Sequence, residues 1–207
     1  MSSVSHPEAL AAPTEPYSPG DSVENPVTGE RGTLIKGPWE GNDVSLLVDL
    51  HVQPGGAVAG EHVHHRLDER FTVKAGQIGF RLDGEESVAG PGQSVEIPRG
   101  SWHDWWNASD REEAVAEVYV SDGTRFMMMI ENFFGLARDG HTNEKGMPDP
   151  LQLTMFATEF RDVLVFKRPP AAVQRILFGV LRPIAVARGY RGTYPQYGRS
   201  LLRTSAP

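Results

Sequence analysis

The residues with the clearest chemical potential in this sequence are three histidines and one glutamate: His62, His64, Glu69 and His103. Imidazole nitrogens and carboxylate oxygens are ligands that divalent first-row metals accept, among them iron, manganese, nickel, zinc and copper. The chain contains no cysteine, so thiolate ligation and disulfide bonds are both excluded. The residue types therefore indicate a metal site built from nitrogen and oxygen alone.

The spacing of these residues predicts that they can face one point. His62 and His64 are two residues apart, so on a β-strand both side chains point to the same face. Glu69 follows after a short connection, near the start of the next apolar run. Two adjacent antiparallel strands can therefore aim three ligands at one place. His103 belongs to a second unit of the same kind, in which Pro98-Arg99-Gly100 forms the turn before it.

Two glycine-flanked motifs surround the four residues. The first reads Gly56-x5-His62-x-His64-x4-Glu69-x6-Gly76, and the second reads Gly92-x5-Pro98-x-Gly100-x2-His103-x3-Asn107. Both match the two motifs of the cupin superfamily at every motif position. The fifteen residues between them, Gln77 to Pro91, make the short spacer typical of small bacterial cupins. The sequence thus resembles the cupins over residues 25–122.

The resemblance implies a fold and a metal site. It implies that one divalent metal ion is held by His62, His64, Glu69 and His103, and that the motif glycines, Pro98 and Asn107 are architectural. Cupins include dioxygenases, isomerases, cyclases and lyases, as well as storage proteins and ligand sensors. The fold therefore does not define the reaction by itself.

The leading hypothesis is a mononuclear metal-dependent enzyme that acts on a small organic substrate, with dioxygenase-type oxidation as its first version. Such a metal would leave one or two coordination positions for substrate, water or O2, and would polarise a carbonyl or enol oxygen or activate O2. With zinc, nickel or manganese, the same site would serve a non-redox isomerase, cyclase or lyase. A further alternative is a non-catalytic sensor or storage cupin that binds a small ligand.

Four other residues are candidates for the pocket and for acid–base chemistry. Trp105 shares the inward parity of His103, and Phe71 lies in the apolar run after the first motif, so both are predicted to line the pocket. Core packing is the alternative role for Phe71. Glu117 and Tyr119 alternate with apolar residues on the last barrel strand and therefore share a face. If that face is the lumen, they are acid–base candidates, and the alternative is a solvated outer face.

Short strand-like runs and turns predict a mainly β fold, a single jelly-roll-like cupin barrel with a C-terminal α-helical extension. Residues 44–53 alternate apolar and polar side chains, as a half-buried strand does. Asp83-Gly84 is a two-residue hairpin signal. Residues 25–122 are predicted to form the barrel. Residues 1–24, which are rich in Pro, Ser, Ala and Glu, are predicted to form a disordered or draped arm.

The hydrophobic pattern takes a helical period in residues 123–190. Thr124 is predicted to cap a first helix, Asp149 to cap a second helix with Gln152 in a capping-box-like pair, and Pro169 to open a third helix. This extension is predicted to pack on the barrel or on a partner subunit, while a basic third helix could instead lie on a membrane surface. Residues 191–207 are predicted to be an irregular basic tail.

The charge is unevenly distributed along the chain. Residues 151–207 hold nine basic and two acidic residues, a net charge of +7, while residues 1–150 carry −14. An acidic barrel and a basic tail are expected to associate, within or between chains. The sequence has no nucleic-acid-binding motif, no apolar run of about 18 residues and no signal-peptide pattern. We therefore expect a cytoplasmic protein without a membrane span, and, because cupins commonly dimerise, a homodimer.

Overall fold

The computed structural model describes residues 13–39, 43–58 and 60–199. Its strands are β1 (Ser22–Asn25), β2 (Glu30–Lys36), β3 (Leu46–Val52), β4 (His62–Val63), β5 (Glu69–Ala75), β6 (Ile78–Leu82), β7 (Glu85–Ala89), β8 (Ser94–Ile97), β9 (His103–Asn107), β10 (Ala114–Val120) and β11 (Val165–Phe166). Its helices are α1 (Gly123–Arg138), α2 (Pro150–Glu159), α3 (Ala171–Ala187) and the short 3-10 helix η1 (Pro195–Tyr197).

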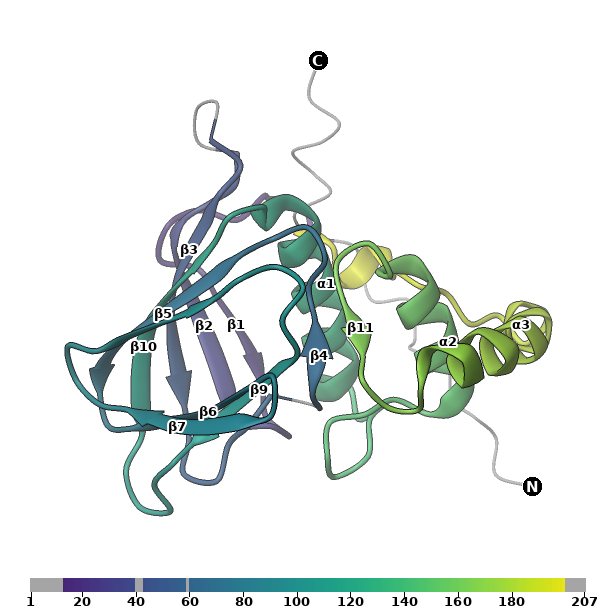
Figure 1. Ribbon diagram of the computed structural model, residues 1–207. Helices are drawn as coiled ribbons and strands as arrows, with labels where there is room; N and C mark the ends of the chain where they lie inside the picture. Colours follow the sequence, from purple (N-terminus) through teal and green to yellow (C-terminus); the bar gives the residue numbers. More distant parts are fainter. Residues whose placement is uncertain (1–12, 40–42, 59, 200–207) are drawn as a thin grey trace.

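Two antiparallel sheets form the barrel, and the helices follow on one side (Figure 1). The strand order is β1-β2-β3-β10-β5-β8 in one sheet and β11-β4-β9-β6-β7 in the other. Strands far apart in the chain are therefore neighbours: β5 lies between β8 and β10, and β4 pairs with β9. This arrangement confirms the predicted mainly β fold with a C-terminal helical extension.

Local sequence signals account for several of these elements. On β3, Leu46, Leu50 and Val52 are buried, as the apolar–polar alternation predicts, although the strand begins two residues after the exposed Val44. The β6–β7 hairpin turns at Asp83 and Gly84, with φ angles of 51° and 95°. A type I′ turn needs positive φ at both positions, which is why this dipeptide predicts the hairpin.

Helix α1 packs against the barrel, where it contacts β1 and β3. Its Met127, Met129 and Phe133 are buried in the same apolar cluster as the barrel interior. The helix begins at Gly123 and is not capped by Thr124, so the predicted cap is wrong. A Cβ atom at residue 123 would lie 2.4 Å from Leu46 Cβ, so only glycine allows the helix to start this close to β3.

Helix α2 begins as predicted, with Asp149 as its cap. The Asp149 carboxylate accepts hydrogen bonds from the backbone N–H groups of Leu151 and Gln152, at 2.9 and 3.2 Å. The Gln152 side chain does not complete a capping box, because it donates to the Arg191 carbonyl and accepts from the Tyr194 hydroxyl instead. Long-range polar partners thus took the place of the predicted local one.

After α2 the chain returns to the barrel as β11, which pairs with β4 and was not predicted. Two ion pairs join the basic residues 151–207 to the acidic residues 1–150: Lys167 with Glu61, and Arg199 Nη2 with Asp21 Oδ2 at 2.9 Å. The predicted association of the oppositely charged segments therefore occurs within one chain.

Within the part that the structure describes, both terminal segments contact the rest of the chain. In the arm, Tyr17 is buried and Ser22–Asn25 forms β1. In the tail, Tyr194 and Tyr197 are buried around η1, and Tyr194 N–H donates to Asn132 Oδ1 at 2.7 Å. Residues 1–12 and 200–207 lie outside the described residues.

Candidate metal centre

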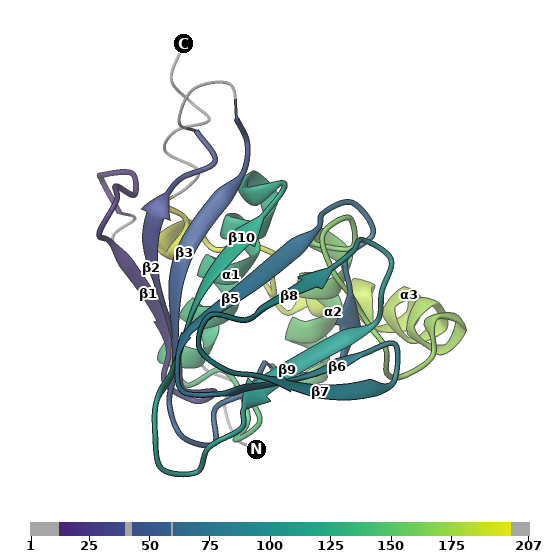
Figure 2. The ribbon, with the colours of Figure 1, turned by 60° about the vertical axis from the view of Figure 1, so that its left-hand side comes forward.

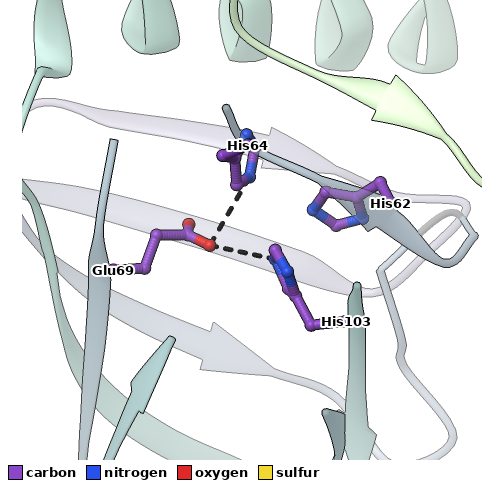
Figure 3. A group of neighbouring side chains, drawn as sticks. All are labelled: His62, His64, Glu69 and His103. Atoms are coloured by element: carbon purple, nitrogen blue, oxygen red, sulfur yellow. Dashed lines mark ion pairs between the residues drawn. The ribbon is translucent and has the colours of Figure 1, made fainter. Parts of the chain in front are cut away.

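Four side chains converge inside the barrel from three strands of its two sheets (Figure 3). His62 opens β4, Glu69 opens β5 and His103 opens β9, while His64 follows directly after β4. His62 and His103 are cross-strand partners, so their side chains meet by register. One ligand atom from each residue lies within 4.8 Å of all the others, and all four residues are buried. The structure thus brings together the four residues that the motifs singled out.

Backbone carbonyls orient all three imidazoles. His62 Nδ1 lies 2.9 Å from the Gly60 carbonyl oxygen, His64 Nδ1 lies 2.7 Å from that of Val163, and His103 Nδ1 lies 3.1 Å from that of Ser101. A carbonyl oxygen only accepts hydrogen bonds, so each Nδ1 carries the proton. Each neutral ring therefore presents the lone pair of Nε2, the arrangement found in metal-binding histidines.

The carbonyl that orients His64 belongs to the helical extension. Val163 lies between α2 and β11 and is separated from His64 by 99 residues. Sequence reasoning did not connect these segments, because a backbone acceptor has no residue-type signal. The extension therefore takes part in building the candidate metal site as well as covering the barrel.

The ligand atoms themselves lack hydrogen-bond partners among the described residues. His64 Nε2, His103 Nε2 and Glu69 Oε2 are buried and unsatisfied. Glu69 Oε2 lies 3.5 Å from His64 Nε2 and 3.1 Å from His103 Nε2. Buried polar atoms without partners are costly and rare in native proteins. A divalent cation would satisfy all of them together, so the residues fit a metal ion.

Three of the four residues hold the protonation states that metal binding needs. Burial lowers the pKa of His62 well below its usual value and also lowers the pKa of His64. Burial would raise the pKa of Glu69, but the surrounding imidazoles outweigh it and lower that pKa to about 2. Burial would lower the pKa of His103 as well, but the Glu69 carboxylate beside it outweighs burial and raises that pKa. Divalent metals bind neutral imidazoles and ionised carboxylates, so a metal would displace a proton from His103.

A cavity of about 120 Å³ adjoins the four candidate metal ligands. His62, His64 and Glu69 line it at one place, and Phe71 and Trp105 form part of its wall, with their rings 5.7 Å apart. The structure therefore places both predicted pocket residues at the cavity. Further apolar wall residues come from α1 and from the segment around β11, including Met127, Met129, Phe133, Leu164 and Phe166.

Glu117 and Tyr119 are not brought to this cavity. Glu117 Oε2 pairs with Lys74 Nζ at 3.1 Å, and Arg70 lies over the Tyr119 ring at 5.2 Å. On β10 the buried positions are the alternate ones, Ala114, Ala116, Val118 and Val120. Because side chains alternate along a strand, Glu117 and Tyr119 lie on the outer face of the barrel, the alternative that the sequence left open.

Sequence reasoning missed a buried acidic residue of the cavity, Glu30 on β2. Its side chain is 7% exposed and lines the same cavity as the metal residues, and Thr28 Oγ1 donates a hydrogen bond to its Oε2. Burial raises the pKa of Glu30 to about 7, partly offset by that hydrogen bond. The sequence did contain a signal for this position: Glu30 is two residues before Gly32 and four before the apolar Leu34, so on a strand all three face the same side. In the structure that side lines the cavity.

Residues 48–121 match the model of the Cupin domain family. With the two-sheet barrel and both motifs in place, residues 48–121 form a cupin domain. No curated protein matches the sequence.

Several solved structures match part of this chain. Pac13 of Streptomyces, described as a nucleoside dehydratase, is 16% identical over 50% of this chain and 77% of its own, with a TM-score of 0.41. KdgF from Halomonas sp. is 20% identical over 49% and 86%, with a TM-score of 0.41. A double-stranded β-helix protein from Klebsiella pneumoniae is 22% identical over 52% and 77%, with a TM-score of 0.39. Each likeness extends over about half of this chain.

Proposed function

We propose that this protein is a mononuclear metal-dependent enzyme that acts on a small, largely apolar organic molecule in the barrel cavity. The observation that carries the proposal is the set of buried, unpartnered ligand atoms on His64, His103 and Glu69 beside an apolar cavity. When bound, a divalent metal would supply Lewis-acid polarisation of a substrate oxygen or, for a redox-active metal, O2 activation.

The residues of the chain define what such a substrate looks like. An apolar cavity of about 150 Å³ in another protein holds benzene, so a cavity of about 120 Å³ suits one small ring or a short chain. Phe71, Trp105 and the α1 side chains would bind its apolar part and exclude water. His62, His64, Glu69 and His103 would fix the end that carries the reacting oxygen.

Dioxygenase-type oxidation, in which both atoms of O2 enter the substrate, is the first version of this proposal. The three-imidazole, one-carboxylate set is one that iron(II) accepts, and a dry apolar wall limits side reactions with water. The same shielding would hold an enol or a similarly electron-rich group against the metal side of the cavity.

A non-redox isomerase, cyclase or lyase is the second version, and Glu30 favours it. A buried carboxyl with a pKa of about 7 can both give and take a proton near neutral pH. Glu30 lines the same cavity as the metal residues and is not one of them, so it can serve a substrate held there.

The test begins with metal content. Protein purified without chelator is expected to contain about one divalent metal per chain, and His64→Ala is expected to bind it at least about 100-fold more weakly, because even groups that only orient a ligand contribute about 10–100-fold. His65→Ala is the matched control, since His65 is exposed beside it. Equal metal content in the two variants would contradict the site.

Reaction type is tested with the metal-loaded protein. Substrate-dependent O2 uptake with small aromatic or aliphatic enols supports the dioxygenase. Exchange of substrate protons with D2O in the absence of O2 uptake supports the non-redox version, and Glu30→Gln is then expected to slow the exchange. A stoichiometric metal with tight ligand binding and neither activity would favour a non-catalytic ligand-binding cupin.

A further inference from the structure

Helix α3 exposes a continuous apolar face. Ile176 is 71% exposed and Val180 is 60% exposed, and three more apolar side chains on the same face are also exposed: Val173, Leu177 and Ile184. Their spacing of three and four residues places them on one side of the helix. The sequence predicted that the extension packs on the barrel or on a partner subunit, and none of the described residues of this chain covers this face.

The helix packs on α2 through a different face and lies at the edge of the molecule, away from the barrel strands (Figures 1 and 2). Gln174 and Ala185 are its buried residues. The Gln174 side chain donates hydrogen bonds of 2.6 Å to the carbonyls of Phe166 and Pro169. At the other end, the side chains of Ala185 and Tyr190 are buried, with 0% and 7% of their surface exposed. The exposed face thus belongs to a helix anchored at both ends.

The charge around this face has one sign. The sequence contains no Asp or Glu after Asp162, whereas Lys167 and Arg168 precede α3, Arg175 and Arg182 lie within it, and Arg188 follows it. The four arginines form no ion pair with any described residue. Arg175 and Arg182 are seven residues apart, so they share a side of the helix, which is nearly opposite the exposed apolar face and also holds the exposed Val186. An apolar face opposite a cationic face is the pattern of a helix that lies in an anionic lipid interface.

A second copy of this chain fits the same face less well. A two-fold symmetric contact places a surface against itself, so it would bring Arg168 and Arg188, which flank α3 and pair with no described carboxylate, toward the same residues of the second copy. An anionic lipid surface offers phosphate groups to the arginines and an apolar layer to the exposed side chains. Spanning a membrane is a different matter: none of the described helices is long and apolar enough to do so.

We propose that α3 docks this protein on an anionic lipid surface, with the face formed by Val173, Ile176, Leu177, Val180 and Ile184 inserted at the level of the headgroups. The proposal is independent of the reaction in the barrel. It requires only the anchored helix, its exposed apolar face and the unpaired arginines.

The experiment measures flotation of the full-length protein with lipid vesicles at about 0.15 M salt. One set of vesicles is phosphatidylcholine alone, and the other contains about one third phosphatidylglycerol. We expect at least about tenfold stronger binding to the anionic vesicles. The double variant Ile176→Ser/Val180→Ser is expected to lose at least about tenfold in that binding, because it removes the two most exposed apolar side chains.

Two further variants serve as controls, one for exposed apolar residues in general and one for the arginines. Val88→Ser changes an apolar side chain on β7 that is 56% exposed, and it is expected to bind as the unchanged protein does. Arg175→Gln/Arg182→Gln leaves the apolar face intact and is expected to weaken binding to anionic vesicles only. Absence of binding to anionic vesicles, or equal binding by the Ile176/Val180 variant, would overturn the proposal. So would a dimer that this variant converts to a monomer, which would assign the face to a second copy.

Discussion

The four candidate metal ligands and helix α3 differ in which side chains are buried and which are exposed. In the barrel, polar atoms of His64, Glu69 and His103 are buried without hydrogen-bond partners. On α3, apolar side chains such as Ile176 and Val180 are exposed without packing partners among the described residues. Each region holds side chains in surroundings opposite to their chemistry, and each does so on a backbone anchored by hydrogen bonds.

The difference between the two regions indicates which kind of binding partner each one fits. Buried unpaired polar atoms fit a small charged ligand, because only a compact ion can enter a closed site and be coordinated by all of these atoms together. Exposed apolar residues call for an extended apolar surface, because their free energy gain scales with the area removed from water. The chain between the regions, from α2 to β11, supports both of them.

The largest expected effect comes from a paired test of buried against exposed apolar residues. Phe156 on α2 is 2% exposed, lines the cavity and contacts the rings of Phe133 and Phe160. Phe156→Ala is expected to lower the free energy of unfolding by about 3–5 kcal/mol, because it removes a large core side chain. Leu177→Ala on α3 is expected to cost about 0.5 kcal/mol or less. Urea unfolding measures both, and equal losses would show that the α3 face is packed.

A smaller effect, dependent on pH, is expected at Glu30. Its pKa is about 7 when folded and about 4.5 when unfolded, so ionisation favours the unfolded chain. The protonated carboxyl carries no penalty below pH 4.5, and stability then falls as pH rises toward 7, by up to about 3 kcal/mol. Glu30→Gln is expected to flatten this dependence, as measured by urea unfolding at pH 5 and pH 8.

The matched control for Glu30 is Glu24→Gln on β1, where the side chain is exposed. This variant is expected to leave the pH dependence as it is in the unchanged protein. If the two variants behave alike, the Glu30 carboxyl is ionised and solvated in the folded protein, and its assignment as a proton-exchanging group of the cavity is contradicted.

The smallest effect is expected on the outer face of the barrel. Glu117→Gln removes a partly exposed ion pair with Lys74 and should change the free energy of unfolding by about 1 kcal/mol or less. Metal content and turnover are expected to stay unchanged, because Glu117 does not line the cavity. A loss of turnover with normal metal content and normal stability would restore Glu117 as an acid–base residue.

Part of this protein could be predicted because its signals are local. The motif spacing identified His62, His64, Glu69 and His103, and their two-residue and turn-based spacing follows from strand geometry alone. The hairpin at Asp83-Gly84 was predicted because the turn type demands those backbone angles. The shared face of His62 and His64 and the hairpin depend on residues close in the chain, so the sequence determines them directly, whereas His103 meets the other three through the pairing of β4 with β9.

The rest was decided by contacts between distant segments. Alternation showed that Glu117 and Tyr119 share a face of β10, but the packing of the sheets decided that this face is outside. The Val163 carbonyl reaches His64 only because α2 and β11 return to the barrel. Amphipathic periodicity predicted α3, but only the tertiary structure decided which of its faces is covered. Periodicity defines faces, and the neighbour that each face meets is a property of the whole fold.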